Sequence, residues 1–281
     1  MTTLTQISGA RGEATHKRCS HLKNEKGFTL VELAIVMIII GLLIGGILKG
    51  QELIANAQIA ATVGQIKGID AAMSTFRDSY QSAPGDMLRA QNRLPNCTDE
   101  GFCFNGTGDS LLGEAGGVIE PNTDEAGAEP SDDAAGEAAG FWKHLAAADL
   151  LNGINGTDVQ AWGEAFPSAN VGGGFVVGQS GSGAIDNATS ATNARGGMYL
   201  VLRTTVDTAA TEDVGEGAIG AAAASRIDRK MDDGAPNGGT IRAIGPVDDD
   251  EDGCSDTDDQ VGVYQESADA QNCSLAIRVQ Q

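Results

Sequence analysis

An acidic run near the C-terminus has the residue types and the spacing of a calcium-binding loop. Counted from its first aspartate, carboxylates stand at positions 1, 3, 5, 9 and 12 and a glycine at position 6, which are Asp248, Asp250, Asp252, Asp256, Asp259 and Gly253. Carboxylate oxygens are preferred ligands of Ca²⁺, and the glycine permits the sharp turn around the ion. Position 7 of such loops supplies a backbone carbonyl, so the Cys254 side chain remains available for other chemistry. The pattern predicts one bound calcium ion.

Two features limit how far this pattern extends. Asp259 stands where glutamate is usual, and no helical pattern flanks the run. We therefore expect a calcium-binding loop and not an EF-hand domain. The alternative is a solvated acidic run, which is common in acidic proteins, although such a run does not require Gly253 at the turn position.

Glu32 is the second residue whose surroundings imply chemistry, because it is the only ionisable side chain between Phe28 and Leu48. A carboxylate in hydrocarbon costs several kcal/mol unless it is paired. A cut before Phe28 would create an ammonium group, and a neighbouring copy shifted by about one helical turn would bring its ammonium to Glu32. Such pairing would set the register between helices, as buried polar groups do in coiled coils. The alternative is a glutamate that reaches back to the membrane surface.

The stretch from Phe28 to Leu48 is long and apolar enough to cross a membrane. Its 21 residues span roughly 30 Å as a helix, the thickness of the hydrocarbon layer. Residues 1–27 carry five basic and two acidic side chains, so this arm is expected to stay cytoplasmic. In a secretory signal the cleavage site follows the apolar region, whereas a cut after Gly27 would retain the membrane helix.

The stretch 26–32, Lys-Gly-Phe-Thr-Leu-Val-Glu, resembles the prepilin peptidase site of type IV pilins and of the pseudopilins of type II secretion. The resemblance implies that residues 1–27 are a leader removed after Gly27. It also implies that Phe28 becomes the N-methylated N-terminus and that Glu32 is the carboxylate used in assembly. The implied partners are a prepilin peptidase, a membrane platform protein, a cytoplasmic assembly ATPase and further copies of the chain.

The resemblance implies a structural subunit and not an enzyme. The precursor would sit in the cytoplasmic membrane, and the processed chain would polymerise helically into a filament on the bacterial surface. Two other functions remain open, a pseudopilin of type II secretion and a minor tip pilin or calcium-dependent adhesin. We find no Ser-His-Asp set and no phosphate-binding glycine loop that follows a strand.

The charge of the chain argues against nucleic acid as a partner. Removal of the leader takes five of 18 Lys and Arg and two of 39 Asp and Glu, which leaves 13 against 37 and a net charge of about −24. Nucleic-acid binding calls for a basic stripe, which this composition opposes. With 4% aromatic residues and 39 glycines, the globular part is expected to be rich in loops around a modest core.

Four cysteines remain after removal of the leader, which takes Cys19. An even number in an exported chain favours disulfides. Three pairings are possible, and we favour the local one, Cys97 with Cys103 and Cys254 with Cys273. The second pair would close a C-terminal loop, which resembles the C-terminal region of many pilins. Zinc is the alternative, but no C-x-x-C spacing is present.

The elements that must position these residues make an α+β, pilin-like fold. One long helix is expected over 28–80. Its first part, 28–50, is the membrane and polymerisation segment. The following segment, 51–82, is expected to be apolar on one face only, because its apolar residues recur every three or four positions. Residues 83–281 form a head in which an antiparallel sheet with long loops lies on the second half of the helix. Strands are expected at 174–178, 198–205, 240–244, 262–264 and 275–279, and short helices at 141–151 and 218–227. The segment 228–236 resembles a loop of some pilin-like proteins.

Overall fold

A computed structural model describes much of the chain from Gly27 onward. The described residues are 27–97, 103, 105–112, 137–154, 161–180, 183–184, 192–204, 206, 217–245, 253–256, 262–268 and 271–279. The chain divides into two compact units, Met1–Gly50 and Gln51–Gln281.

The long helix α1 covers Leu30–Tyr80, 51 residues. No proline interrupts it, and it ends where Gln81 takes a left-handed conformation with φ of 56°. Between Gln51 and Tyr80 its buried residues recur every three or four positions, at Ile59, Thr62, Val63, Ile66, Ile69, Ala72, Met73 and Phe76. The one-faced pattern expected over 51–82 is therefore present from Ile59 to Phe76, whereas none of residues 51–58 is buried.

The first part of α1 buries none of its side chains within this chain. Every residue from Leu30 to Lys49 is exposed, including Ile38 at 63% and Leu42 at 73%. By length and composition this helix can cross a membrane. Because so much apolar surface is unfavourable in water, it requires hydrocarbon or other helices around it.

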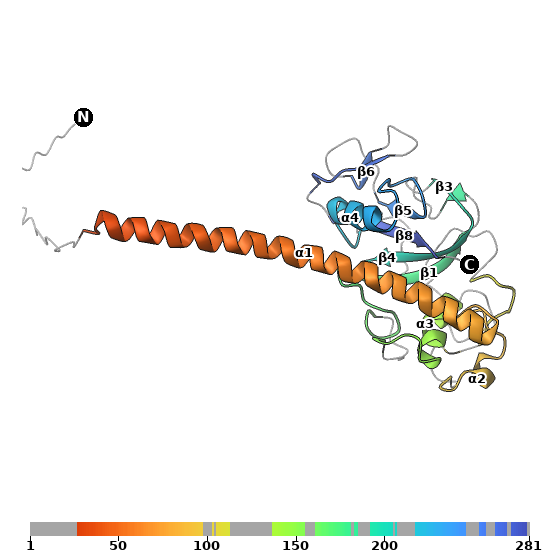
Figure 1. Ribbon diagram of the computed structural model, residues 1–281. Coiled ribbons are helices and arrows are strands. Elements are labelled where there is room, and N and C mark those ends of the chain that lie inside the picture. The colour runs from red at the N-terminus through yellow and green to blue at the C-terminus, as the bar shows by residue number, and fades with distance from the viewer. Residues whose placement is uncertain are drawn as a thin grey trace, which may run out of the picture. The chain divides into compact units, whose positions relative to one another are not determined.

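A four-stranded antiparallel sheet in the order β1-β4-β8-β5 lies beside the second half of α1 (Figure 1). Its strands are Gly174–Ser180 (β1), Gly197–Arg203 (β4), Ser274–Arg278 (β8) and Ile241–Ile244 (β5). The expected strands at 174–178, 198–205, 240–244 and 275–279 correspond to these four. The α+β class is as predicted, with one long helix and a small antiparallel sheet.

Shorter elements complete the described part of the second unit. They are α2 (Ala90–Arg93), α3 (Glu137–Ala147), α4 (Ala221–Met231), β2 (Gly183–Ala184), β3 (Thr192–Ala194), β6 (Ser255–Asp256) and β7 (Val263–Tyr264). The hairpin of β6 and β7 pairs Ser255 with Tyr264 and Asp256 with Val263.

The two short helices differ from expectation at their ends. Helix α3 stops at Ala147 and not at the expected residue 151. Asp149 adopts a left-handed conformation with φ of 58°, and the N–H of Leu150 donates to the carbonyl of Leu145, an ending common at helix C-termini. Helix α4 begins three residues later than expected. Ile219 pairs with Cys273 in a β-bridge, which holds that residue outside the helix.

The core joins α1, α3, α4 and the sheet. Its largest fully buried side chains include Trp142, Phe76, Phe141, Phe175 and Leu200. The rings of Phe76 on α1 and His144 on α3 lie nearly parallel with centroids 6.3 Å apart. His144 is thus a packing residue, as its apolar neighbours in the sequence indicated.

Ile69→Ala should lower the free energy of unfolding by about 2–4 kcal/mol, because Ile69 is 1% exposed in the core and the substitution leaves a cavity. The matched control is Ile54→Ala on the same helix, where the side chain is 61% exposed and a change within about 0.5 kcal/mol is expected. Denaturant unfolding of the full chain in detergent, followed by near-UV circular dichroism of its two tryptophans, measures both. Equal losses would contradict the placement of the core.

Candidate functional site

Glu32 closes a capping box at the start of α1. Thr29 is the residue before the helix, and its hydroxyl oxygen accepts the N–H of Glu32 at 3.2 Å. In return the N–H and the hydroxyl of Thr29 both donate to Glu32 Oε2, each at 3.0 Å. These bonds satisfy donors that a helix N-terminus otherwise leaves unpaired. Both bonds donated by Thr29 go to Oε2, and the described chain gives Oε1 of Glu32 no hydrogen bond.

The capping box was missed in the sequence analysis, although the sequence carries its signal. A threonine followed three residues later by glutamate, directly before an apolar run, is the signature of such a box. Its effect is that hydrogen bonds within the chain orient the Glu32 carboxylate.

The Gly27-Phe28 bond precedes the helix and is open within the single chain. Helix α1 begins at Leu30, the Phe28 side chain is 81% exposed, and a side chain at Gly27 would meet nothing within 4 Å. A peptidase needs a non-helical segment of this kind, because it must bind the backbone on both sides of the bond. Lys26 lies outside the described residues.

Four glycines of the apolar segment pack against nothing in the part of the chain that the structure describes. A Cβ atom built at Gly41, Gly45, Gly46 or Gly50 would meet nothing within 4 Å. Since each glycine costs the helix about 1 kcal/mol relative to alanine, these positions are compatible with close approach of other helices.

Most of the predicted calcium loop lies outside the described residues. Asp248, Asp250, Asp252 and Asp259 belong to that part, whereas Cys254 and Asp256 are described. The carbonyl of Cys254 accepts the N–H of Gln265 at 3.2 Å. This uses one of its two lone pairs, so the carbonyl expected to bind the ion retains a second one.

The structure contains the two disulfides of the local pairing, Cys97 with Cys103 and Cys254 with Cys273. The second joins the start of the β6–β7 hairpin to the residue before β8. It therefore fixes the hairpin, and the part of the acidic run around Cys254, to the central sheet.

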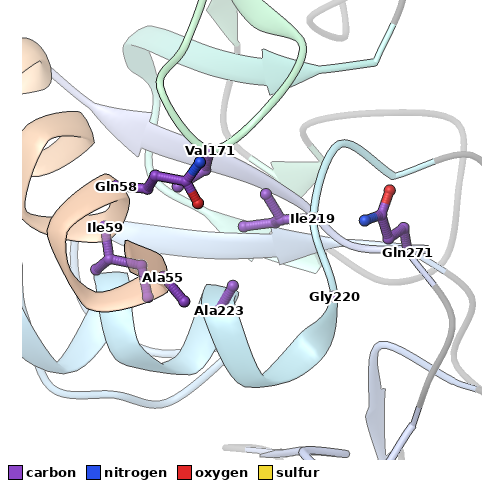
Figure 2. A pocket seen from close by; sticks show the side chains of 8 residues that line it. All are labelled: Ala55, Gln58, Ile59, Val171, Ile219, Gly220, Ala223 and Gln271. Atoms are coloured by element: carbon purple, nitrogen blue, oxygen red, sulfur yellow. The ribbon is translucent and has the colours of Figure 1, made fainter. Parts of the chain in front are cut away.

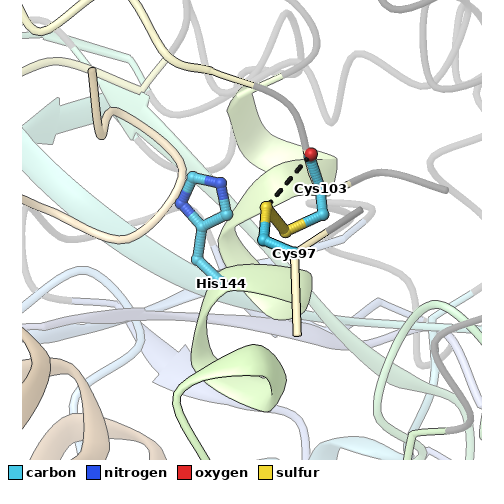
Figure 3. A group of neighbouring side chains, drawn as sticks. All are labelled: Cys97, Cys103 and His144. Atoms are coloured by element: carbon cyan, nitrogen blue, oxygen red, sulfur yellow. Dashed lines mark hydrogen bonds between the residues drawn. A yellow bond between two sulfur atoms is a disulfide. The ribbon is translucent and has the colours of Figure 1, made fainter. Parts of the chain in front are cut away.

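His144 lies beside the Cys97–Cys103 disulfide (Figure 3). Three such residues bind zinc when the cysteines are thiolates, but here both sulfurs are in the disulfide. The imidazole Nδ1 also accepts the N–H of Gly85 at 2.8 Å. If Nε2 of the neutral imidazole bound a metal, the ring proton would have to be on Nδ1. Nδ1–H would then point at the N–H of Gly85, and the hydrogen bond between them would be lost. This group is therefore a packing cluster.

Two buried acids that the sequence analysis did not single out hold one loop. Asp86 is 2% exposed and Glu137 is 1% exposed. Asp86 accepts the N–H groups of Gly108 at 2.5 Å and Ser110 at 2.8 Å, and Glu137 accepts the N–H of Thr107 at 2.6 Å and its hydroxyl at 2.8 Å. Burial raises the pKa of Asp86, and the N–H groups oppose that rise. These carboxylates fix the loop after the disulfide against α3.

Asp228 is a buried acid within the segment 228–236. It is fully buried on α4, where it accepts the hydroxyl of Tyr264 at 2.9 Å and the N–H of Gly234 at 3.3 Å. Burial raises the pKa of Asp228 to about 6, although both hydrogen bonds favour the ionised form. The contact to Tyr264 ties α4 to the β6–β7 hairpin.

Asp232 and Glu266 complete the polar contacts around α4. Burial alone would raise the pKa of Asp232, but hydrogen bonds from Thr240 and Ile241 and the charge of Arg242 hold it below its usual value. Glu266 bonds Ser225 at 2.8 Å and Arg229. The Ser225 bond and the charge of Arg229 lower the pKa of Glu266 despite partial burial.

A shallow cavity of about 110 Å³ lies between α1 and the start of α4 (Figure 2). Gln58 and Ile59 of α1 face Gly220 and Ala223 across it, and Gln271 lies at its side. Pockets that hold drug-sized ligands measure about 300–1,000 Å³. This cavity holds a few water molecules or one small side chain.

The comparisons with known proteins agree with the N-terminal geometry. Residues 22–48 match the model of the prokaryotic N-terminal methylation motif, which is the signature of type IV pilins and pseudopilins. No curated protein and no solved structure gave a significant match. The motif includes Gly27, Phe28 and Glu32, while the head is described by its own structure alone.

The folded chain should gain stability as the pH falls from 8 to 5, because of Asp228. Its folded pKa of about 6 lies above the ordinary aspartate value, so the folded state takes up a proton as the pH falls through 6 while the unfolded chain does not. The gain is roughly 1 kcal/mol. Thermal unfolding of the detergent-solubilised chain at both pH values should show it in the wild type and not in Asp228→Asn. An equal pH effect in both proteins would contradict the assignment to Asp228.

Proposed function

We propose that this chain, which carries the N-terminal signature of type IV pilins and pseudopilins, is the structural subunit of an extracellular type IV pilus-like filament. A prepilin peptidase cuts after Gly27, and Phe28 becomes the methylated N-terminus. The processed subunits leave the cytoplasmic membrane and polymerise through α1, with the help of a membrane platform protein and a cytoplasmic ATPase. The heads then form the outer surface of the filament.

The observation that carries this proposal is the state of Glu32. One oxygen of its carboxylate accepts both hydrogen bonds from Thr29, and its other oxygen has no partner in the described chain. In an apolar environment a carboxylate is stabilised most by a positive charge. The Phe28 ammonium of a neighbouring copy supplies that charge at the same depth in a helical bundle.

The exposed apolar surface of α1 supports assembly. Its side chains from Leu30 to Leu48 are all exposed in the described chain, and the stretch contains glycines spaced for close helix contact. In the precursor the lipid covers this surface. In a filament the same surface packs on the helices of other subunits, so one segment serves as membrane anchor and as polymer core.

A pseudopilin of type II secretion carries the same signature, as does a minor tip pilin or a calcium-dependent adhesin with a pilin stem. The abundance of the chain distinguishes these functions. Sheared surface filaments made mostly of this chain support the main proposal, traces at filament ends support a tip subunit, and retention in the periplasm supports a pseudopilin.

We further propose that the acidic run binds one calcium ion through Asp248, Asp250, Asp252, Asp256, Asp259 and the carbonyl of Cys254. The support is the spacing of the carboxylates around Gly253 and the anchoring of the run beside a disulfide. Calcium would reduce the repulsion among these acids and stabilise the head.

Glu32→Gln separates the two roles of the carboxylate. Glutamine still accepts the Thr29 N–H in a capping box, but it has no charge for the Phe28 ammonium. The variant should be cut after Gly27 like the wild type, as measured by intact mass, and the yield of sheared filaments should fall at least about tenfold. Glu164→Gln in the head is the matched control. Normal filaments from Glu32→Gln would contradict the pairing, and retention of residues 1–27 in the wild type would contradict the proposed processing.

Calcium at 100 times its dissociation constant should raise the stability of the detergent-solubilised chain by about 2.7 kcal/mol, and a chelator should reverse the effect. Asp248→Asn with Asp250→Asn should abolish the response, because both residues occupy ligand positions. Asp249→Asn with Glu251→Gln removes the same amount of charge, but from positions that do not bind the ion. This double variant should retain the stability response to calcium. Thermal unfolding with calcium or chelator gives the result, and an unchanged wild-type melting temperature would exclude the ion.

A further inference from the structure

Three arginines gather on one face of the central sheet around Tyr199. Residues directly opposite each other in an antiparallel pair lie on the same face, as do residues two apart in a strand. Tyr199 is opposite Arg278, and Val201 is opposite Ala276, which is opposite Arg242. Arg195 lies just before β4, and its carbonyl accepts the Tyr199 hydroxyl at 2.7 Å. We call Arg195, Arg242 and Arg278 the arginine cluster.

Electrostatics agrees with this placement. Burial raises the pKa of Tyr199, and the positive charges of Arg278, Arg242 and Arg195 oppose that rise. The three charges therefore act on the same hydroxyl. The opposite face of the sheet is apolar and belongs to the core, with Leu200, Leu275 and Ile277 at most 3% exposed.

Two hydrogen-bond donors of the arginine cluster have no partner among the described residues. Arg242 is 8% exposed, and the buried Nε–H groups of Arg242 and Arg278 have no hydrogen-bond partner among the described residues. The Arg229–Glu266 ion pair involves none of the three. Arg242, however, lies close enough to Asp232 for its charge to act on that carboxylate. Arg278 donates through one terminal nitrogen to the carbonyl of Gly196 at 3.0 Å. A buried donor without a partner costs free energy, more so when it is charged. Arg195 is exposed and Arg278 is half-buried, so the cluster opens to solvent on one side.

The charge of the chain indicates what fits there. The mature chain has 37 acidic and 13 basic side chains, so neighbouring heads in a filament repel each other unless acidic groups of one meet basic groups of the next. The arginine cluster concentrates three of those 13 cations on one face. Guanidinium groups bind carboxylates well, because their planar N–H donors match the two carboxylate oxygens.

We propose that the arginine cluster binds aspartate or glutamate side chains of a neighbouring copy of this chain, and so joins adjacent heads. This inference rests on the proposed function, since it requires a polymer. Arg195 and Arg278 hold the incoming carboxylate, and Arg242 adds positive potential from beneath. The contact aligns the acidic heads, while Glu32 sets the register of the helices.

The first experiment compares two variants with equal loss of charge. Arg195→Gln with Arg278→Gln should raise the soluble fraction of sheared filaments about tenfold at moderate salt, as measured by sedimentation. Arg226→Gln with Lys230→Gln removes two exposed cations of α4 and should change the soluble fraction of filaments little. Thermal unfolding in detergent shows whether each variant folds. An equal effect of the two double variants would overturn the proposal.

The second experiment identifies the source of the carboxylate. Filaments are assembled from a mixture of ¹⁴N- and ¹⁵N-labelled subunits that carry Arg278→Lys. If this variant does not fold, Arg195→Lys is used in its place. The filaments are then treated with a carbodiimide, which couples the new lysine amine to a carboxylate in contact with it. Mixed-isotope cross-linked peptides are expected. Links within one copy only, or no links, would overturn the proposal. A wild-type chain that forms no filaments would overturn both this inference and the proposed function, whereas wild-type filaments without links between copies would overturn this inference alone.

Discussion

The structure depends on one constraint, a single carboxylate placed near the start of a helix that is otherwise apolar for 21 residues. The capping box with Thr29 meets part of this constraint inside the chain, because it gives Oε2 of Glu32 two donors. It leaves the negative charge unneutralised, which in hydrocarbon still costs free energy. In the proposed function, the N-terminus created by a cut after Gly27 is the positive group at this depth. Processing and assembly would then be linked by electrostatics.

The head solves a second electrostatic problem, the accumulation of acidic residues. Buried carboxylates such as Asp86 and Asp228 are used within the fold, where they accept backbone N–H groups and a tyrosine hydroxyl. The disulfide between Cys254 and Cys273 fixes the segment that carries the acidic run. In our proposal, the arginine cluster binds acidic side chains of the next copy. A cation in the acidic run would lower the remaining repulsion further.

The sequence predicts the parts of this structure that depend on local pattern. The extent of α1, the apolar segment and the four strands of the sheet follow from periodicity and from the absence of proline. The end of α3 was placed wrongly, because Asp149 adopts a left-handed conformation without being glycine. Asp228 and the arginine cluster depend on contacts between distant segments, such as Tyr199 opposite Arg278, which one sequence does not reveal. The capping box at Thr29 and Glu32 is different, since its signature was local and was overlooked.

The most direct test of the account is a distance within assembled filaments. Solid-state NMR on filaments mixed from two populations, one with ¹⁵N at the Phe28 amine and the other with ¹³C in the Glu32 carboxyl group, detects contacts between copies alone. The account predicts strong dipolar dephasing, corresponding to a nitrogen-to-carbon distance of about 4 Å or less for an ion pair. No dephasing in the mixed filaments, or dephasing only when both labels are in one copy, would contradict the account.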